Sequence, residues 1–252
     1  MAQVSFRFFA ELNDFLPEDK KKCSFIYTFQ GRPSIKDAIE AIGVPHPEVD
    51  LIVVNGDSVG FNHIIKDQES IAVYPVFESF DISPIVRLRE KPLRIIRFIL
   101  DINLGKLTRW LRWLGFDSRM EKNVSDRTIV DLARQDKRII LTRDQGLLKI
   151  KEVTHGYWVR TTDPEEQLTE VIKRFDLTKQ FKPFTRCMVC NGLINQIDKA
   201  EVIDQLLPKT KSKFTHFFHC TSCFKIYWQG SHYKKLSLKL AAILNKLENQ
   251  PI

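Results

Sequence analysis

The feature that most constrains this chain is a set of four cysteines arranged as two C-x-x-C pairs. Cys187 and Cys190 lie in RCMVCNG, Cys220 and Cys223 lie in HCTSCFKIYW, and 29 residues separate the pairs. A C-x-x-C turn brings two thiolates to one ion, so two such turns complete a tetrahedral zinc site. Four thiolates leave no open position, which predicts a structural zinc ion. The spacing suits a zinc ribbon, with the intervening residues as a small β hairpin.

The distribution of apolar residues indicates a protein that works inside the cell. No stretch approaches the roughly eighteen apolar residues of a membrane-spanning helix, and Arg7, Glu11 and Asp14 interrupt the segment where a signal peptide needs an apolar core. Five cysteines in 252 residues do not form the dense framework of a secreted domain. The fifth, Cys23, lies in the apolar run CSFIYTF, where we expect it to be buried. We therefore predict a cytoplasmic protein with no membrane partner.

Charge is distributed unevenly along the chain. Residues 1–84 carry 7 Lys and Arg against 13 Asp and Glu, although the whole chain carries 39 against 31. The final 168 residues therefore have a net charge of +14. This excess favours a polyanionic partner such as RNA, because each cation that neutralises a phosphate releases a counterion. A solvated basic surface without a partner is the alternative.

The first 84 residues are predicted to form a small β-rich domain. VSFRFF and CSFIYTFQ alternate as strands around the polar turn LPEDKKK, and LIVVNGD and SIAVYPVF follow as later strands. Between them, Ser34 can cap the helix IKDAIEAIG, with Gly43 at its end. This order resembles the β-grasp fold of ubiquitin and the small sulfur carriers. Because the last strand runs into more protein, a carrier's free Gly-Gly end is lacking, which leaves docking, substrate guidance or stabilisation as roles.

Two further domains are predicted after the linker ISPIVRLREKP, which places a boundary near residue 85. Residues 85–184 alternate strand and helix patterns, which predicts an α/β domain with a mostly parallel sheet. Residues 185–252 contain both cysteine pairs and end in the helix SLKLAAILNKLENQ. The predicted fold class is thus multidomain, α/β together with α+β.

Three aspartates of the middle domain could share a divalent metal ion. Asp101 ends the run RIIRFIL, Asp144 ends RIILTR, and Asp126 opens the helix DRTIVDLARQ. In an α/β sheet, ligands bind beyond the carboxyl ends of the strands, and Mg²⁺ or Mn²⁺ held there can activate water for phosphodiester cleavage. The alternative for each aspartate is a helix cap or turn cap, and Asp126 taken alone favours that alternative.

Longer patterns connect these aspartates with known ribonucleases. DRTIVDLARQDKRIILTRD, which ends in Thr-x-Asp, resembles the closing motif of PIN-domain ribonucleases. More closely, DINLGKLTRWLRWLGFDS, RIILTRDQGLL and the two cysteine pairs resemble the Mut-seven C-terminal RNase family, in which an N-terminal ubiquitin-like module also occurs. The resemblance implies a PIN-like nuclease domain in which Asp101, Asp126 and Asp144 bind the catalytic metal.

The chain departs from standard PIN domains in one respect. Asp126 follows Asp101 by only 25 positions, which leaves little room for the helices that carry the second acidic residue of such domains. The candidates for a fourth acid are Asp117, Glu121, Asp131 and Asp163.

Cations near these motifs are candidates for contacts with RNA phosphates. In the helix GKLTRWLRWLG the leucines form one stripe and the cations lie largely off it, while Trp110 and Trp113 either pack or stack on bases. Arg143 adjoins Asp144, and basic and aromatic residues interleave around the cysteine pairs, as suits nucleic-acid binding. The predicted RNA-binding residues are Lys106, Arg109, Arg112 and Arg143.

Three hypotheses for the function follow. The leading one is a ribonuclease that depends on Mg²⁺ or Mn²⁺ and has a structural zinc ribbon that aids RNA binding. The second is a non-catalytic RNA-binding or ribosome-associated factor with a degenerate PIN-like pocket. The third is a docking protein whose acidic β-grasp domain binds a protein partner or covers the basic domain.

Overall fold

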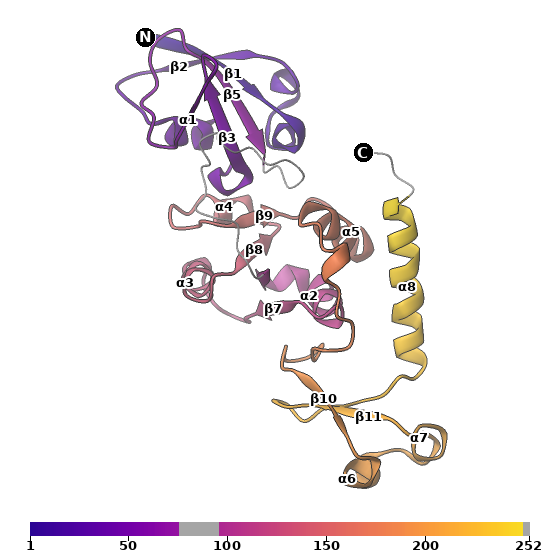
Figure 1. Ribbon diagram of the computed structural model, residues 1–252. Helices are drawn as coiled ribbons and strands as arrows, with labels where there is room; N and C mark the ends of the chain where they lie inside the picture. The colour runs from indigo at the N-terminus through magenta and orange to yellow at the C-terminus, as the bar shows by residue number, and fades with distance from the viewer. Residues whose placement is uncertain (76–95, 249–252) are drawn as a thin grey trace. The chain divides into compact units, whose positions relative to one another are not determined.

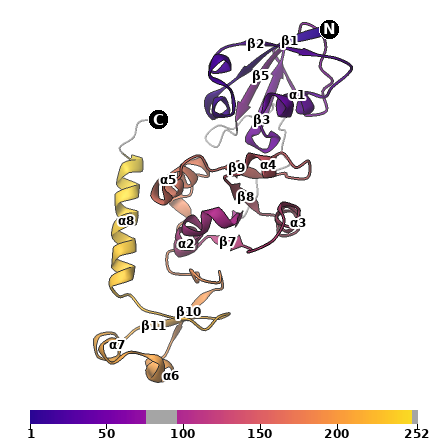
Figure 2. The same cartoon turned by 180° about the vertical axis from the view of Figure 1, so that it is seen from behind.

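The computed structural model describes residues 1–75 and 96–248, which form two compact units. The first unit contains the described N-terminal residues together with Val124–Trp158. The second contains Ile96–Asn123 together with the described residues from Val159 onwards. Figures 1 and 2 show the elements from opposite sides. The predicted linker and the boundary near residue 85 lie outside the described residues.

The N-terminal part of the first unit is a five-stranded mixed sheet with the order β2-β1-β5-β3-β4 (Figure 1). β1 pairs with β5 in parallel, and its pairing with β2 is antiparallel, as are the pairings of β3 with β4 and β5. The predicted β-grasp fold is confirmed, with β4 as an additional short strand. The strands are β1 (Ala2–Phe8), β2 (Phe25–Phe29), β3 (Val49–Val54), β4 (Asp57–Val59) and β5 (Ser70–Pro75).

The core of this sheet forms because side chains alternate between its two faces. Phe6 and Phe8 of β1 point to the same face and are fully buried. Helix α1 (Ile35–Ile42) covers this core, and it begins at a capping box in which Ser34 and Asp37 each accept a hydrogen bond from the other's backbone amide.

The connections of the sheet are short. Asn55 and Gly56 have positive φ values of 51° and 98°, and they form the tight turn between β3 and β4. Cys23 is exposed, so the prediction that it is buried is wrong; it precedes β2 instead of lying within the strand. The 3-10 helices of this part are η1 (Ala10–Phe15), η2 (Glu18–Lys20) and η3 (His46–Glu48).

Parallel strands form the middle of the chain, as the alternating strand and helix patterns predict. β7 pairs with β6 in parallel, β9 pairs with β8 in parallel, and the sheet order is β7-β6-β8-β9. The strands are β6 (Arg97–Leu100), β7 (Asp117–Met120), β8 (Ile139–Thr142) and β9 (Gly156–Trp158). The helical elements are η4 (Ile102–Leu104), α2 (Gly105–Trp113), α3 (Asp126–Asp136), α4 (Gln145–Leu148), α5 (Pro164–Arg174) and η5 (Thr178–Gln180).

The C-terminal part of the second unit is an antiparallel sheet with the order β10-β11-β12. The predicted hairpin is only partly correct, because short helices interrupt the segment between β10 and β11. Val202, Leu206 and Phe217 form a small core beneath them. None of the described helices is long and apolar enough to cross a membrane. The elements are β10 (Ile194–Ile197), α6 (Lys199–Val202), η6 (Ile203–Gln205), α7 (Pro208–Lys213), β11 (Phe217–Cys220), β12 (Ile226–Tyr227) and α8 (Ser231–Glu248).

Candidate functional site

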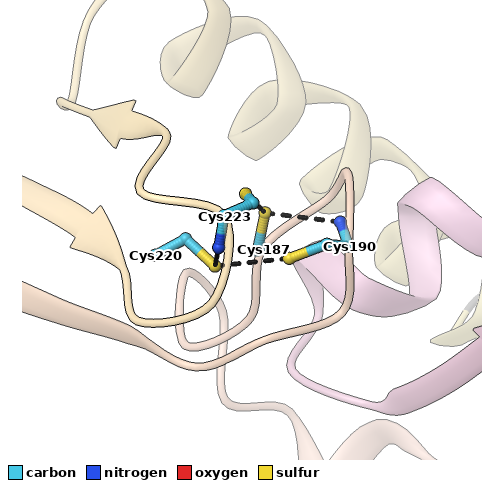
Figure 3. Close-up of side chains that lie close together, drawn as sticks. All are labelled: Cys187, Cys190, Cys220 and Cys223. Carbon is cyan, nitrogen blue, oxygen red and sulfur yellow. Dashed lines mark hydrogen bonds between the residues drawn. The ribbon is translucent and has the colours of Figure 1, made fainter.

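Four cysteine side chains converge from two loops of the second unit (Figure 3). The Sγ atoms of Cys187 and Cys223 lie 3.6 Å apart, and those of Cys190 and Cys220 lie 3.3 Å apart. All four sulfur atoms lie within 4.8 Å of one another. Within the described part of the chain, these cysteines are the group of His, Cys, Asp or Glu side chains that could hold a metal ion.

Hydrogen bonds to sulfur favour the thiolate form that binds metal. Burial opposes ionisation of Cys187, but hydrogen bonds from the hydroxyl of Tyr227, 3.0 Å from Sγ, and from backbone amides outweigh it and lower its pKa to about 6. The amides of Ser222 and Cys223 likewise lie 3.4 Å and 3.5 Å from the Sγ of Cys220. Such outer contacts orient ligands around an ion. The two loops thus direct the four sulfur atoms towards one another, and the thiolate form is favoured at Cys187.

Gly192 lies so close to the cysteine cluster that only glycine fits. A Cβ atom there would lie 2.9 Å from the Sγ of Cys220 and 2.5 Å from the Oγ of Ser222. Carbon atoms do not approach neighbouring atoms so closely without displacing them. The glycine of the RCMVCNG motif therefore permits the two cysteine loops to approach each other.

Arg112 of α2 connects the loop between Cys187 and Cys190 with the rest of the second unit through hydrogen bonds. Its side chain is only 5% exposed. Its Nε donates to the carbonyl of Ser118 at 2.8 Å, and its Nη1 donates to that of Val189 at 2.7 Å. Burial lowers the pKa of this guanidinium below its ordinary value. The contacts of Arg112 in the described residues are therefore structural, and its contact with RNA stays a prediction.

Asn191 makes a second attachment between the cysteine loops and β7. Its Nδ2 donates to Asp117 Oδ1 at 2.8 Å, and its Oδ1 accepts from the amide of Ser118 at 3.0 Å. Asp117 also forms an ion pair with Arg186, with 3.5 Å between charged atoms. Asp117 therefore has a structural role in joining the ribbon to the parallel strands.

Asp101 lies directly after β6, at the carboxyl end of that strand. It is 8% exposed, and its Oδ1 accepts a hydrogen bond of 2.7 Å from the amide of Asn103 at the start of η4. A cap and a metal ligand are compatible roles, because a carboxylate has two oxygens. The turn fixes the orientation of this carboxylate.

Asp144 and Asp126 belong to the first unit. Asp144 follows β8, and its Oδ1 accepts a hydrogen bond of 2.7 Å from the amide of Gly146 as the cap of α4. Asp126 is exposed in the first turn of α3, where the cap is Ser125, whose side chain accepts from the amide of Thr128. The capping alternative for Asp126 is therefore wrong, while Asp144 does act as a cap.

The other acidic candidates have structural partners. Glu121 pairs with Arg119 at 2.7 Å. Asp131 lies 3.8 Å from Arg127 in an exposed pair, and Asp163 caps α5 by accepting from two backbone amides. With Asp117 attached to the ribbon, each of the four has a structural function in the described residues.

The cations of α2 line two cavities of the second unit. One cavity of about 760 Å³ lies among α2, the cysteine loops and α8, and another of about 560 Å³ lies beside the loop after Asp101. Lys106 and Arg109 are exposed and line both. Sequence analysis missed Phe184 and Tyr227 in the first cavity. Their nearness to the cysteine pairs was the available signal.

The backbone of Arg143 is held by Trp158, which lies in β9 of the same unit. Its carbonyl accepts a hydrogen bond of 3.2 Å from the indole of Trp158. The ring of Trp158 also packs against Phe15 of η1, with 5.0 Å between centroids. The β-grasp part thus contacts Trp158, and Trp158 in turn holds the loop that carries Arg143 and Asp144.

Comparisons with known proteins agree with this architecture. Residues 96–240 match the family model of the Mut7-C RNAse domain, and residues 1–81 match that of Mut7-C ubiquitin. The chain is 35% identical over 106 residues to the exonuclease mut-7 homolog of Homo sapiens; the match covers 40% of this chain and 12% of that protein. No solved structure matches the chain. Because the nuclease-domain model spans more than half of the sequence, the chain belongs to the Mut7-C RNase family.

Proposed function

We propose that this protein is a metal-dependent ribonuclease. The observation that carries the proposal is the match to the Mut7-C RNAse domain over residues 96–240, a range that contains Asp101, Asp126, Asp144 and all four clustered cysteines. The similar human protein is named an exonuclease, which also supports nuclease chemistry. RNA is the proposed substrate, and hydrolysis of its phosphodiester bonds is the proposed reaction.

Carboxylate oxygens are the donors that Mg²⁺ and Mn²⁺ favour, so the three aspartates fit such an ion chemically. Asp101 and Asp144 each follow a strand, and a backbone amide holds one oxygen of each in a fixed orientation. A bound divalent ion would activate water and neutralise charge on the phosphate. In the proposed reaction these aspartates hold the ion, and Arg143 binds the phosphate.

The four cysteines are proposed to bind structural zinc. Their sulfur atoms lie close together, and thiolate sulfur is a preferred ligand of zinc. Four protein ligands leave no position for a catalytic water, so this ion would stabilise the fold of the ribbon. Lys106 and Arg109 are retained as proposed RNA contacts because both are exposed.

The test uses end-labelled single-stranded RNA with Mg²⁺ or Mn²⁺, or with neither ion. The variant Asp101→Asn with Asp144→Asn is compared with Asp204→Asn, which alters an exposed carboxylate of η6. We expect metal-dependent cleavage by the original protein and by Asp204→Asn, and its loss in the double variant at equal zinc content. Cleavage that persists in the double variant would refute the assigned carboxylates.

The alternative is a non-catalytic RNA-binding or ribosome-associated factor. In that case all three proteins bind RNA equally well and none cleaves it in either metal ion. The proposed protein partner for the acidic β-grasp domain and the cytoplasmic location stay predictions from the sequence.

A further inference from the structure

The cavity of about 760 Å³ in the second unit has an aromatic wall. Its rings contact one another: Trp110 and Trp113 meet edge to face at 6.0 Å, and Phe184 meets Tyr233 at 5.2 Å. Contacts of this kind hold the rings in fixed positions. The wall thus offers preformed flat surfaces, which are what an unstacked nucleobase binds.

The rim of the same cavity is cationic. The charged side chains that line it within the described part of the chain are all basic, with neither Asp nor Glu among them. Lys239 also pairs with Glu165, which itself is not part of the lining. An apolar peptide would gain nothing from such a rim, whereas a nucleic-acid backbone would. The basic residues are Lys106, Arg109, Lys225, Lys235 and Lys239.

Trp113 supplies an observation independent of charge. Its side chain lines the cavity and is 3% exposed, and its indole N–H has no acceptor among the described residues. A buried donor without an acceptor is costly, and a ligand that accepts its hydrogen bond removes that cost. Nucleobases present carbonyl oxygens and ring nitrogens as acceptors.

A second cavity of about 560 Å³ lies between the aromatic cavity and the loop after Asp101. The second cavity is lined by Ile102 and Asn103, the two residues after Asp101. Lys106 and Arg109 line both cavities. Two exposed cations therefore connect the aromatic wall with the loop of a proposed metal ligand.

We propose that the aromatic cavity binds an unpaired base of single-stranded RNA, and that Lys106 and Arg109 contact phosphates of the strand that continues along the second cavity towards Asp101. In a duplex, the stacking of neighbouring base pairs covers the base faces that the aromatic wall would contact, so duplex RNA is excluded from the cavity. The direction towards Asp101 rests on the proposed ribonuclease function, while the binding of the base does not.

Binding is measured by the fluorescence anisotropy of labelled oligouridine and of a labelled RNA duplex of equal length. All proteins carry Asp101→Asn and Asp144→Asn, so that the RNA is not cleaved during the measurement. No chelator is then needed to stop cleavage, and zinc stays bound. Trp110→Ala tests the aromatic wall, with Trp110→Phe as the conservative variant. Lys106→Gln with Arg109→Gln tests the rim. The matched control is Lys209→Gln with Lys213→Gln, two exposed cations of α7 outside both cavities.

We expect Trp110→Ala to weaken oligouridine binding about ten-fold, as for loss of one stacked base, and to leave duplex binding unchanged. Trp110→Phe should retain most of the affinity. The Lys106 and Arg109 variant should also reduce the steepness of the salt dependence by about 0.7 for each lost phosphate contact. Thermal unfolding and zinc content identify any variant that fails to fold.

Equal RNA binding by the rim variant and the α7 control would overturn the proposal. Equal loss of duplex and oligouridine binding in Trp110→Ala would overturn it as well. Failure of the ribonuclease proposal has a different result. The Trp110 and rim variants would still weaken oligouridine binding, but the original protein would not cleave RNA.

Discussion

The backbone amide of Trp158 donates a hydrogen bond to Glu48 Oε1, 2.6 Å away, although 110 positions separate the two residues in the chain. Glu48 is fully buried. Two positions before it, the Nε2 atom of His46 lies 2.7 Å from the carbonyl oxygen of Val153. The end of β9 therefore depends on a carboxylate supplied by the β-grasp part. Through the Trp158 indole, this contact continues to the carbonyl of Arg143.

Replacing Glu48 should destabilise the first unit. Glu48→Ala removes the acceptor for a buried amide and should lower the free energy of unfolding by about 2 kcal/mol. Glu48→Gln keeps one carbonyl oxygen and should cost less. Urea denaturation measures both against Glu201→Gln, an exposed position expected to change stability by less than about 0.5 kcal/mol. A loss no larger than that of the control would contradict the role given to Glu48.

Removing a ligand of the cysteine cluster should release the metal ion and unfold the ribbon. Cys187→Ser should bind much less zinc than an equimolar amount and should lose the near-UV circular dichroism of the ribbon aromatics, because metal binding and folding are coupled. Cys23→Ser is the matched control, since Cys23 is exposed and lies outside the cluster. Equimolar zinc in both variants would show that the cluster is not the binding site.

Gly192→Ala should weaken metal retention while leaving every ligand in place. The added Cβ would lie 2.9 Å from Cys220 Sγ, so the two loops must separate. We expect zinc transfer to a colorimetric chelator to become at least about ten-fold faster, in line with the effect of disturbing outer contacts of metal ligands. Gly60→Ala is the control, because its Cβ would meet no atom within 4 Å. Identical transfer rates would contradict the crowding argument.

Arg112→Lys should reduce stability without acting on RNA directly. Lysine keeps the charge, but its single amino group cannot replace the planar guanidinium, which donates to the carbonyls of Ser118 and Val189 at the same time. We expect a loss of about 2 kcal/mol in urea denaturation, with the salt dependence of RNA binding unchanged. Arg109→Gln should show the opposite pattern. A lowered salt dependence of RNA binding with full stability in Arg112→Lys would contradict this structural role and support Arg112 as an RNA contact.

The sequence predicts the elements of this fold well because local rules govern them. The cap Ser34 and the terminal Gly43 locate α1, and the spacing of Cys187, Cys190, Cys220 and Cys223 predicts the cluster that the structure brings together. Such patterns require only neighbours in the chain or a known ligand geometry.

The features that local patterns do not reveal depend on tertiary contacts. In a helical pattern Arg112 is typical of a surface cation. In the structure it is buried and donates hydrogen bonds to the carbonyls of Met188 and Val189, more than seventy positions away. Sequence alone does not reveal that Asn191 attaches to β7, or that Glu48 serves the end of β9, because both contacts join distant segments.

The hydrogen bond from the amide of Ser118 to Asn191 also affects the behaviour of the protein in solution. β7 is the outermost strand of its sheet, and an uncovered outer strand invites pairing with other chains. Asn191 occupies part of that edge, and it lies in the loop whose shape the cysteine cluster maintains. Loss of the proposed zinc ion would therefore leave the edge of this strand uncovered, and we expect the protein to aggregate when the ion is removed.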